Sequence, residues 1–582
     1  MKQIFRKMYL LSNRLFFYNY LRHYILFKVF VFLLLATSNS IHSQNNEDID
    51  ALFKAYKEDN PGIAISVIKD NKVLYQKGYG MANLEYEIPI TVKTKFHVAS
   101  LSKQFTAFMI LKLQEEGLLS INNDVREYIP ELPDYGKTIT IKHLLTHSSG
   151  IRDQWRLLEL AGWRLDDVIK TKQIFKLITS QKTLNFDPGE SFGYSNSGYT
   201  LMAMIVERLT NMSFAEYAKK TIFEPLQMSD SFFYDDHEEM MANRAYSYKK
   251  VNNKLKKSNL NFATVGPTSL FTTIEDMNKW AFNFKNMAIG NKTIFKSMNQ
   301  KAKKNNGSVS SYAKGQFVKQ HKGFKMIYHS GSDAGYRSYF ARFPELGYQF
   351  IIFANAAYIS AYDEIFKLID HYLQSQYPKN KNRVKEESEE DFQYKDDMFI
   401  SLSESEMKKF EGTYFNRETK NYTDVKLKND TLYVKGDIFP KDIKLYPVGE
   451  RNFKVKGTKY DLSVNFTKNN HEEPVLELRI PDILWYWNVK VESVNPSNYL
   501  GTYYSDELKT EYELIEKNKA LYLTHQQLDD IKISQINKVY FSSNNRNFSN
   551  IRFQENDFGK IEGFSISNES IKDIRFSKKQ KI

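Results

Sequence analysis

An internal repeat in the last third of the chain restricts the possible folds more than any other feature of the sequence. The run 410–414 (FEGTY) matches 499–503 (YLGTY), and a second match follows within each copy at the same offset of 89 residues. Each copy is a series of short alternating segments separated by Asn, Asp and Gly. Two copies are too few for a solenoid or a propeller, so the repeat predicts two antiparallel β modules, over 403–494 and 495–582.

A polar, charge-blocked stretch at 376–402 precedes the repeat and predicts a linker. Residues 48–375 have strand-like runs at both ends and helical patterns between them. Two β-rich runs on either side of Asp70-Asn71 predict a hairpin, and the apolar run 105–113, which ends near Gly117, predicts a buried helix. This order predicts one α+β domain, whose antiparallel sheet is completed by both ends of the segment and flanked by helices.

The first 43 residues have the pattern of a secretory signal peptide. They contain six Lys and Arg residues and no acid, followed by the apolar core Val29–Ala36 and a small and polar run with plausible cleavage near Ser43. An uncleaved anchor that starts at Phe16 is the alternative, although Lys28 interrupts its apolar stretch. Both interpretations place the working domains outside the cytoplasm, periplasmic or extracellular, with membrane contact only through such an anchor.

The chain has no cysteine, which excludes disulfides, cysteine nucleophiles, thiolate zinc sites and iron–sulfur clusters. Its formal net charge is +13, and part of this surplus lies in the N-terminal leader. Because no basic cluster accompanies a recognition motif, we do not expect a nucleic-acid partner. Any covalent catalysis must use a side chain other than cysteine.

Ser100 and Lys103 form an S-x-x-K pair at the start of the predicted buried helix. Positions i and i+3 share a helix face, so the lysine amine can approach the serine hydroxyl. The N-terminus of the helix favours an anion at Ser100, and burial lowers the pKa of Lys103 so that it can act as a base. The alternative for this short motif is an N-cap serine followed by an exposed lysine.

Two further motifs supply the groups that such a pair needs. Tyr194 and Asn196 lie in a Gly- and Ser-rich loop before a helix, where a phenol can share a proton with Lys103 and an amide can bind a substrate carbonyl. His329, Gly331 and Ser332 end a strand. Gly331 would let a substrate backbone pair with the sheet edge, and the N–H of Ser332 would join that of Ser100 in an oxyanion hole.

The three motifs, in this order, resemble the fingerprint of the serine β-lactamase and penicillin-binding-protein superfamily. The pattern is most similar to the branch that holds class C β-lactamases, D-Ala-D-Ala carboxypeptidases, D-aminopeptidases and family VIII esterases. The resemblance implies a β-lactamase/transpeptidase-like domain followed by two small all-β modules, lipocalin-like barrels or meanders. It also implies that Ser100 is the nucleophile, that Lys103 and Tyr194 share acid and base duties, and that Asn196 and His329 orient the substrate.

One departure from the class C pattern is His329, which stands where those enzymes have lysine. A neutral histidine holds a substrate carboxylate less firmly, which disfavours efficient β-lactam hydrolysis. The resemblance therefore implies a serine hydrolase that forms an acyl-enzyme on Ser100, without a cofactor. Its expected substrate is an amide, peptide or ester, small or peptidic, of a D-amino-acid or cell-wall-related kind, with peptidoglycan among the candidates.

Two alternatives stay open. The first is a true β-lactamase, which would differ in whether acylated Ser100 turns over. The second, from another class, is a non-catalytic envelope-binding protein in which the β modules bind glycan or protein and the hydrolase domain is a retained scaffold.

Three other sets of residues carry weaker signals. His143 and His147 have a spacing that can bind zinc, but the sequence shows no third ligand and we expect no metal site. Asp333 and Arg337 directly follow the third motif, so they could either determine substrate specificity or form an ion pair at the surface. The run 485–487 (WYW) suits either a carbohydrate platform or, more often, buried aromatics in a strand.

Overall fold

The computed structural model describes residues 47–377, 394, 398–416, 419, 421–436, 441–457, 461–469, 472–480, 484–492, 495–568 and 570–580. The N-terminal leader and most of the linker lie outside this range. Among the described residues, none of the helices combines the length and the apolar character that a membrane span requires.

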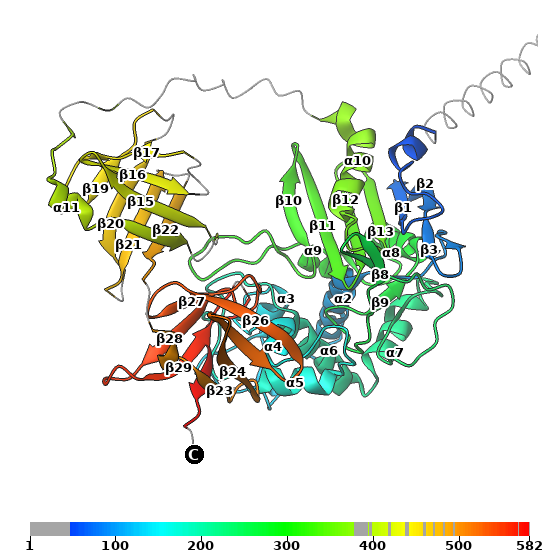
Figure 1. Ribbon diagram of the computed structural model, residues 1–582. Helices are drawn as coiled ribbons and strands as arrows, with labels where there is room; N and C mark the ends of the chain where they lie inside the picture. The colour runs from blue at the N-terminus through cyan, green and yellow to red at the C-terminus, as the bar shows by residue number, and fades with distance from the viewer. Residues whose placement is uncertain are drawn as a thin grey trace, which may run out of the picture.

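A six-stranded antiparallel sheet is the centre of the first domain, and both ends of the domain build it, as predicted (Figure 1). In spatial order its strands are β10 (Phe317–His321), β11 (Phe324–Asp333), β12 (Tyr336–Phe343), β13 (Tyr348–Ala354), β1 (Ile63–Lys69) and β2 (Lys72–Tyr79). Asp70 and Asn71 both have positive φ, which the tight turn of the predicted β1–β2 hairpin requires.

Helices cover both faces of this sheet because its central strands are apolar on both sides. In β1, Ile65 packs in a cluster with the helix α10, whereas Ala64 belongs to the larger cluster with the helices of the opposite face. The predicted buried helix is α2, in which every residue from Ser102 to Leu111 is buried. The helices are α2 (Ser102–Glu115), α3 (Ile141–Leu145), α4 (Gln154–Leu160), α5 (Thr171–Thr179), α6 (Asn196–Thr210), α7 (Phe214–Ala218), α8 (Ile274–Asn286), α9 (Lys292–Met298) and α10 (Ala361–Leu373).

Short strands join the helices to the sheet. They are β3 (Met81–Asn83), β4 (Ile88–Pro89), β5 (Phe96–His97), β6 (Phe232–Phe233), β7 (Tyr248–Val251), β8 (Lys254–Lys257) and β9 (Leu270–Thr272). Strands β5, β9 and β6 form a three-stranded sheet, and β5 leads directly to the first residues of α2.

The two copies of the repeat are both all-β, as expected. Module 1 contains α11 (Glu404–Lys408) and one nine-stranded sheet of β14 (Gly412–Asn416), β15 (Tyr422–Lys428), β16 (Thr431–Gly436), β17 (Ile443–Lys444), β18 (Tyr446–Pro447), β19 (Asn452–Lys454), β20 (Ser463–Lys468), β21 (Pro474–Ile480) and β22 (Leu484–Lys490). Because β17 and β18 are consecutive in the chain and stand at opposite ends of the strand order, the sheet curls toward a barrel.

Module 2 is a closed eight-stranded barrel of β23 (Gly501–Ser505), β24 (Thr510–Lys517), β25 (Ala520–His525), β26 (Leu528–Gln535), β27 (Tyr540–Ser542), β28 (Ile551–Glu555), β29 (Ile561–Ile566) and β30 (Ile574–Lys578). The repeat is visible in its details. Tyr414 donates to the carbonyl of Phe410, and Tyr503 donates in the same way to Tyr499.

Module 2 packs directly on the helices of the first domain, beside α4 and α5 (Figure 1). Its core residues belong to the same hydrophobic cluster as α2, α4 and α6. The Tyr512 hydroxyl donates to the carbonyl of Leu160 at the end of α4, and a buried ion pair joins Arg152 to Glu507 at 2.9 Å. The barrel is therefore part of the folded body that contains α4.

The close approach of the barrel depends on Gly162, which has φ of +89°. A Cβ at this position would lie 2.0 Å from the His525 ring, which cannot easily move because Thr510 and Gln527 hold its two nitrogens. Gly117 has a similar φ of +76°, but a Cβ there would meet nothing within 4 Å, so it provides a matched comparison.

We expect Gly162→Ala to destabilise the protein more than Gly117→Ala. Both substitutions place alanine in the left-handed region, which destabilises the fold by about 1–2 kcal/mol. Only Gly162→Ala also overpacks the contact with the barrel, which destabilises the fold by about a further 1–3 kcal/mol. Thermal unfolding of the two variants measures the difference. Equal losses would contradict the tight docking of module 2.

Candidate active site

Ser100 lies in a short 3-10 turn, Ala99–Leu101, that leads directly into α2. Ala99 has φ of +50°, an unusual conformation for a residue with a Cβ. The Ser102 hydroxyl donates to the Ala99 carbonyl at 2.6 Å, which holds this strained turn. Ser100 is therefore presented at the N-terminal end of a buried helix by backbone that the fold keeps in place.

Lys103 is fully buried, and its Nζ has three oxygen partners. Nζ lies 3.0 Å from Ser100 Oγ, 2.8 Å from Asn196 Oδ1 and 2.8 Å from the carbonyl oxygen of Pro267. Burial lowers the pKa of Lys103 to about 7, although Asp333 and Asp153 act in the opposite direction. A substantial fraction of this amine is therefore neutral near pH 7 and can accept the serine proton.

Tyr194 lies in the loop before α6, and Ser100 is near enough to its hydroxyl to oppose part of the rise in the tyrosine pKa. Lys103 Nζ is 4.9 Å from the centre of the Tyr194 ring, and the His147 ring packs on its other side with the centroids 4.1 Å apart. Burial raises the pKa of Tyr194 well above its usual range. The phenol therefore stays protonated at neutral pH, where it can donate a hydrogen bond or a proton.

Asn196 is the first residue of α6 and joins the lysine to a residue that sequence reasoning missed. Its Oδ1 accepts from Lys103, while its Nδ2 and its backbone N–H donate to Asp153 Oδ2 at 2.7 and 2.8 Å. One Nδ2 hydrogen remains for a substrate carbonyl. No motif in the sequence pointed to Asp153, because its role depends on a contact with Asn196, 43 residues further along the chain.

His329 lies within reach of the site, but its ring nitrogens are engaged inside the protein. Nδ1 donates to the carbonyl of Ser330 at 2.6 Å, and Nε2 lies 3.1 Å from the Tyr312 hydroxyl, which donates to it. Burial lowers the pKa of His329 to about 3, so the ring is neutral. In this arrangement the His329 ring packs against Tyr194 and Tyr312, and it offers no free nitrogen to a substrate.

Ser332 lies on β11 beyond the end of β10, because the β10–β11 pairing stops at Tyr328. This leaves residues 329–333 without a β10 partner. The predicted substrate contact of Gly331 stays a prediction, and the structure adds a packing role, since a Cβ there would lie 2.2 Å from the Val98 carbonyl oxygen and 3.1 Å from Ala99 Cβ. Glycine is needed so that β11 can pack against the Ser100 turn.

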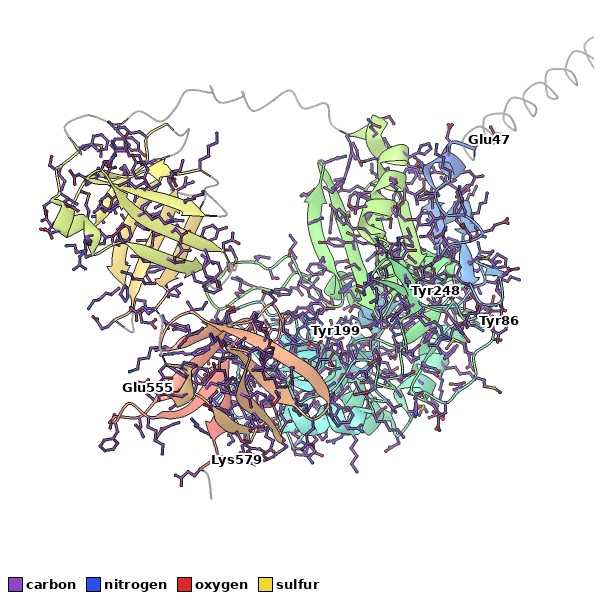
Figure 2. All side chains as sticks on the ribbon, viewed as in Figure 1. Glu47, Tyr86, Tyr199, Tyr248, Glu555 and Lys579 are labelled. Atoms are coloured by element: carbon purple, nitrogen blue, oxygen red, sulfur yellow. The ribbon has the colours of Figure 1, made fainter. Side chains whose placement is uncertain are left out.

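A cavity of about 760 Å³ lies beside Tyr194 and Asn196. Residues of both the first domain and module 2 line it. Tyr194, Asn196 and Ser332 line it from the first domain, and Arg546 and Ser570 line it from the barrel. Figure 2 shows Tyr199, which packs against His147, between the sheet and module 2. No local pattern in the sequence indicated these barrel residues.

Asp333 and Arg337 also line the cavity, but they form no salt bridge with each other. The Thr268 hydroxyl donates to Asp333, and burial raises the pKa of this carboxyl to about 6. Arg337 donates to the carbonyls of Ala334 and Tyr336 at 3.2 and 2.7 Å. The surface ion pair is therefore wrong, and a role in specificity stays a prediction.

His143 and His147, the pair whose spacing can bind zinc, accept hydrogen bonds from backbone N–H groups of the protein. His143 Nδ1 accepts from the Thr140 N–H in a capping box, and His147 Nδ1 accepts from the Ser195 N–H. Within the described ranges, no group of three or more acids and histidines is arranged to hold a metal ion. Trp487 is exposed on β22, whereas the side chain of Trp485 lies outside the described residues.

The lysine pKa predicts the pH dependence of Ser100 reactivity. We expect the rate of Ser100 labelling by a fluorophosphonate to rise with pH through a midpoint near 7, because only neutral Lys103 accepts the serine proton. Labelling rates from pH 5 to 10 measure this. A rate that keeps rising to pH 10 would contradict a lysine with a lowered pKa.

Asp153→Asn provides a second test of the same network. Because the Asp153 carboxylate raises the pKa of Lys103, its removal moves the labelling midpoint to lower pH. At pH 8 the rate should fall about tenfold, since Asn196 loses a charged hydrogen-bond acceptor. A midpoint that moves to higher pH would contradict the assigned interaction.

Comparisons with known proteins identify the family of the chain. Protein flp of Staphylococcus aureus strain N315 is 28% identical over 340 residues, which cover 53% of this chain and 62% of that relative, so the chain spans about three fifths of its length. Penicillin-binding protein 4* of Bacillus subtilis strain 168 is 28% identical over 319 residues, covering 52% of this chain and 70% of that protein.

A solved structure, the octameric penicillin-binding protein homologue from Pyrococcus abyssi, aligns with a TM-score of 0.52 and 26% identity. The alignment covers 77% of this chain and 99% of that one. The Beta-lactamase family model matches residues 49–373, more than half of the chain. The protein therefore belongs to the beta-lactamase family of serine hydrolases.

Proposed function

We propose that the protein is an exported hydrolase that cleaves an amide, peptide or ester bond through an acyl-enzyme on Ser100. The observation that carries this proposal is the 3.0 Å contact between Ser100 Oγ and the buried Nζ of Lys103. A serine hydroxyl is a weak nucleophile until a nearby base removes its proton. Here that base is a desolvated amine rather than the histidine of a Ser-His-Asp triad.

In the acylation step, Ser100 Oγ attacks the substrate carbonyl carbon while its proton passes to neutral Lys103. The N–H groups of Ser100 and Ser332 are the proposed donors to the resulting oxyanion. The tetrahedral intermediate then collapses, and the bond from carbon to the leaving nitrogen or oxygen breaks. The Tyr194 phenol protonates the leaving group and recovers its proton from Lys103, which returns the amine to its neutral form.

Deacylation repeats the sequence with water in place of the serine. A water molecule that attacks the acyl carbon loses its proton to Lys103, directly or through the Tyr194 hydroxyl near Ser100. The Ser100 oxygen leaves and takes a proton, which restores the starting state. This scheme needs no cofactor, because each proton moves between groups of the site and water.

The neutral and internally bonded His329 supports a substrate of the D-amino-acid or cell-wall-related kind over a β-lactam. Such a residue offers no cation for the carboxylate that a penicillin carries, so fast β-lactam turnover is not expected. The cavity is large enough for a peptide-sized group and is open along β11. Peptidoglycan and smaller D-amino-acid amides or esters are the proposed substrates, reached after export by the leader at 1–43.

The direct test is intact-mass spectrometry of the protein after exposure to a fluorophosphonate. We expect one adduct, which Ser100→Ala abolishes because the attacking oxygen is gone. Ser195→Ala is the matched control, since this buried hydroxyl has no hydrogen-bond partner among the described residues and its loss should change labelling less than about twofold. An adduct that persists in Ser100→Ala would overturn the proposed nucleophile.

A penicillin distinguishes the proposed activity from a true β-lactamase. We expect a Ser100 adduct that forms and is released slowly, over many minutes, because the site lacks a cation at position 329. Time-resolved intact mass follows the adduct. Complete turnover within seconds would identify a β-lactamase instead, and failure of both reagents to label would favour the non-catalytic alternative.

A further inference from the structure

The segment that precedes α4 is held on one side by module 2. Arg152 is 1% exposed, and its guanidinium donates to Glu507 at 2.9 Å and to the carbonyl of Lys572 at 2.7 Å. Glu507 also accepts from the backbone N–H of Lys182 at 2.7 Å. One carboxylate of the barrel thus holds two separate loops of the first domain.

A second set of contacts lies at the next residue. The backbone N–H of Asp153 donates to the carbonyl of Ser570 at 3.4 Å, and the Asn185 side chain donates to the same carbonyl at 2.9 Å. Asn185 also accepts from the backbone N–H of Lys572 at 2.8 Å. The barrel loop that contains Ser570 and Lys572 therefore contacts the backbone of Asp153 itself.

On its other side, Asp153 contacts the catalytic group. Its Oδ2 accepts two hydrogen bonds from Asn196, whose Oδ1 accepts from Lys103. Continuous polar contacts thus lead from Glu507 to Arg152, along the chain to Asp153, and through Asn196 to the lysine beside Ser100. Every side chain in this series, apart from the half-buried Asn196, is buried, so little water competes for its partners.

We propose that module 2 is a positioning element of the active site, which sets the orientation of Asn196 and Lys103 through Asp153. Glu507 and Arg152 are positioning residues in this scheme, because they act on the reacting groups through Asp153 and do not touch them. This inference rests on the proposed acylation of Ser100. It assigns to the barrel a role in the rate of that step, beyond lining the cavity.

An adjacent ion pair at the same interface provides a matched control. Lys182 and Asp506 are paired at 2.5 Å, but both side chains are more than half exposed to solvent. Exposed pairs contribute little, whereas loss of one partner from a buried pair leaves an uncompensated charge. Glu507 and Asp506 are neighbours in the chain, so substitutions at the two positions disturb the same loop.

The experiment measures fluorophosphonate labelling of Ser100 in the full chain, as a maximal rate and a half-saturating reagent concentration. We expect Glu507→Ala to lower the maximal rate at least tenfold, with the half-saturating concentration changed less than about threefold. Asp506→Ala should stay within about twofold in both. Glu507→Gln keeps an oxygen for Arg152 and Lys182, so it should restore most of the rate even though its melting temperature is lower.

A double-mutant cycle tests whether the effect passes through Asp153. Glu507→Ala and Asp153→Ala should be strongly non-additive, with the double variant little slower than the slower single variant. If Glu507→Ala does not fold, Asn185→Ala replaces it, because it removes the contacts to Ser570 and Lys572 from a less buried position. Wild-type labelling in a folded barrel variant, or fully additive losses, would overturn the inference.

The result is distinguishable from failure of the proposed function. If the unmodified protein is not labelled at Ser100, the proposed acylation fails before any barrel variant is compared. If it is labelled and the barrel variants are labelled equally fast, only the positioning role fails.

Discussion

The burial of one lysine ammonium is the constraint on which the rest of the site depends. Removing such a charge from water is costly unless oxygen acceptors replace its hydration, and Lys103 receives three, from Ser100, Asn196 and Pro267. These acceptors come from distant parts of the chain, so the lysine also fixes their relative positions. The compensation is incomplete, which leaves the pKa near 7, so the amine can accept a proton at neutral pH.

The surrounding elements exclude water from Lys103 and fix the position of its side chain. A wall of aromatic rings, formed by Tyr194, Tyr199, Tyr312, His147 and His329, packs beside it. Strand β11 can contact the Ser100 turn because position 331 is glycine. Asp153 holds Asn196 from the far side and is itself held by module 2. Module 2 is therefore in direct contact with this arrangement.

Local patterns predicted the elements but not their long-range assembly. The turn residues Asp70 and Asn71, the apolar run of α2 and the repeat of the β modules each indicate a structure that needs only neighbouring residues. The Ser100–Lys103 pair was predictable for the same reason, since i and i+3 share a helix face. Asp153, the Tyr312 contact with His329 and the barrel residues Arg546 and Ser570 were missed, because their roles depend on docking between segments far apart in the chain.

A pKa of about 7 leaves about half of the Lys103 amine neutral at pH 7, and the titration of this amine can be measured by itself. Carbon-13 NMR of protein labelled at lysine Cε, with the Lys103 signal assigned by its loss in Lys103→Met, reports the protonation of this amine. We expect a titration midpoint near 7. A midpoint above 10, like that of an exposed lysine, would contradict it.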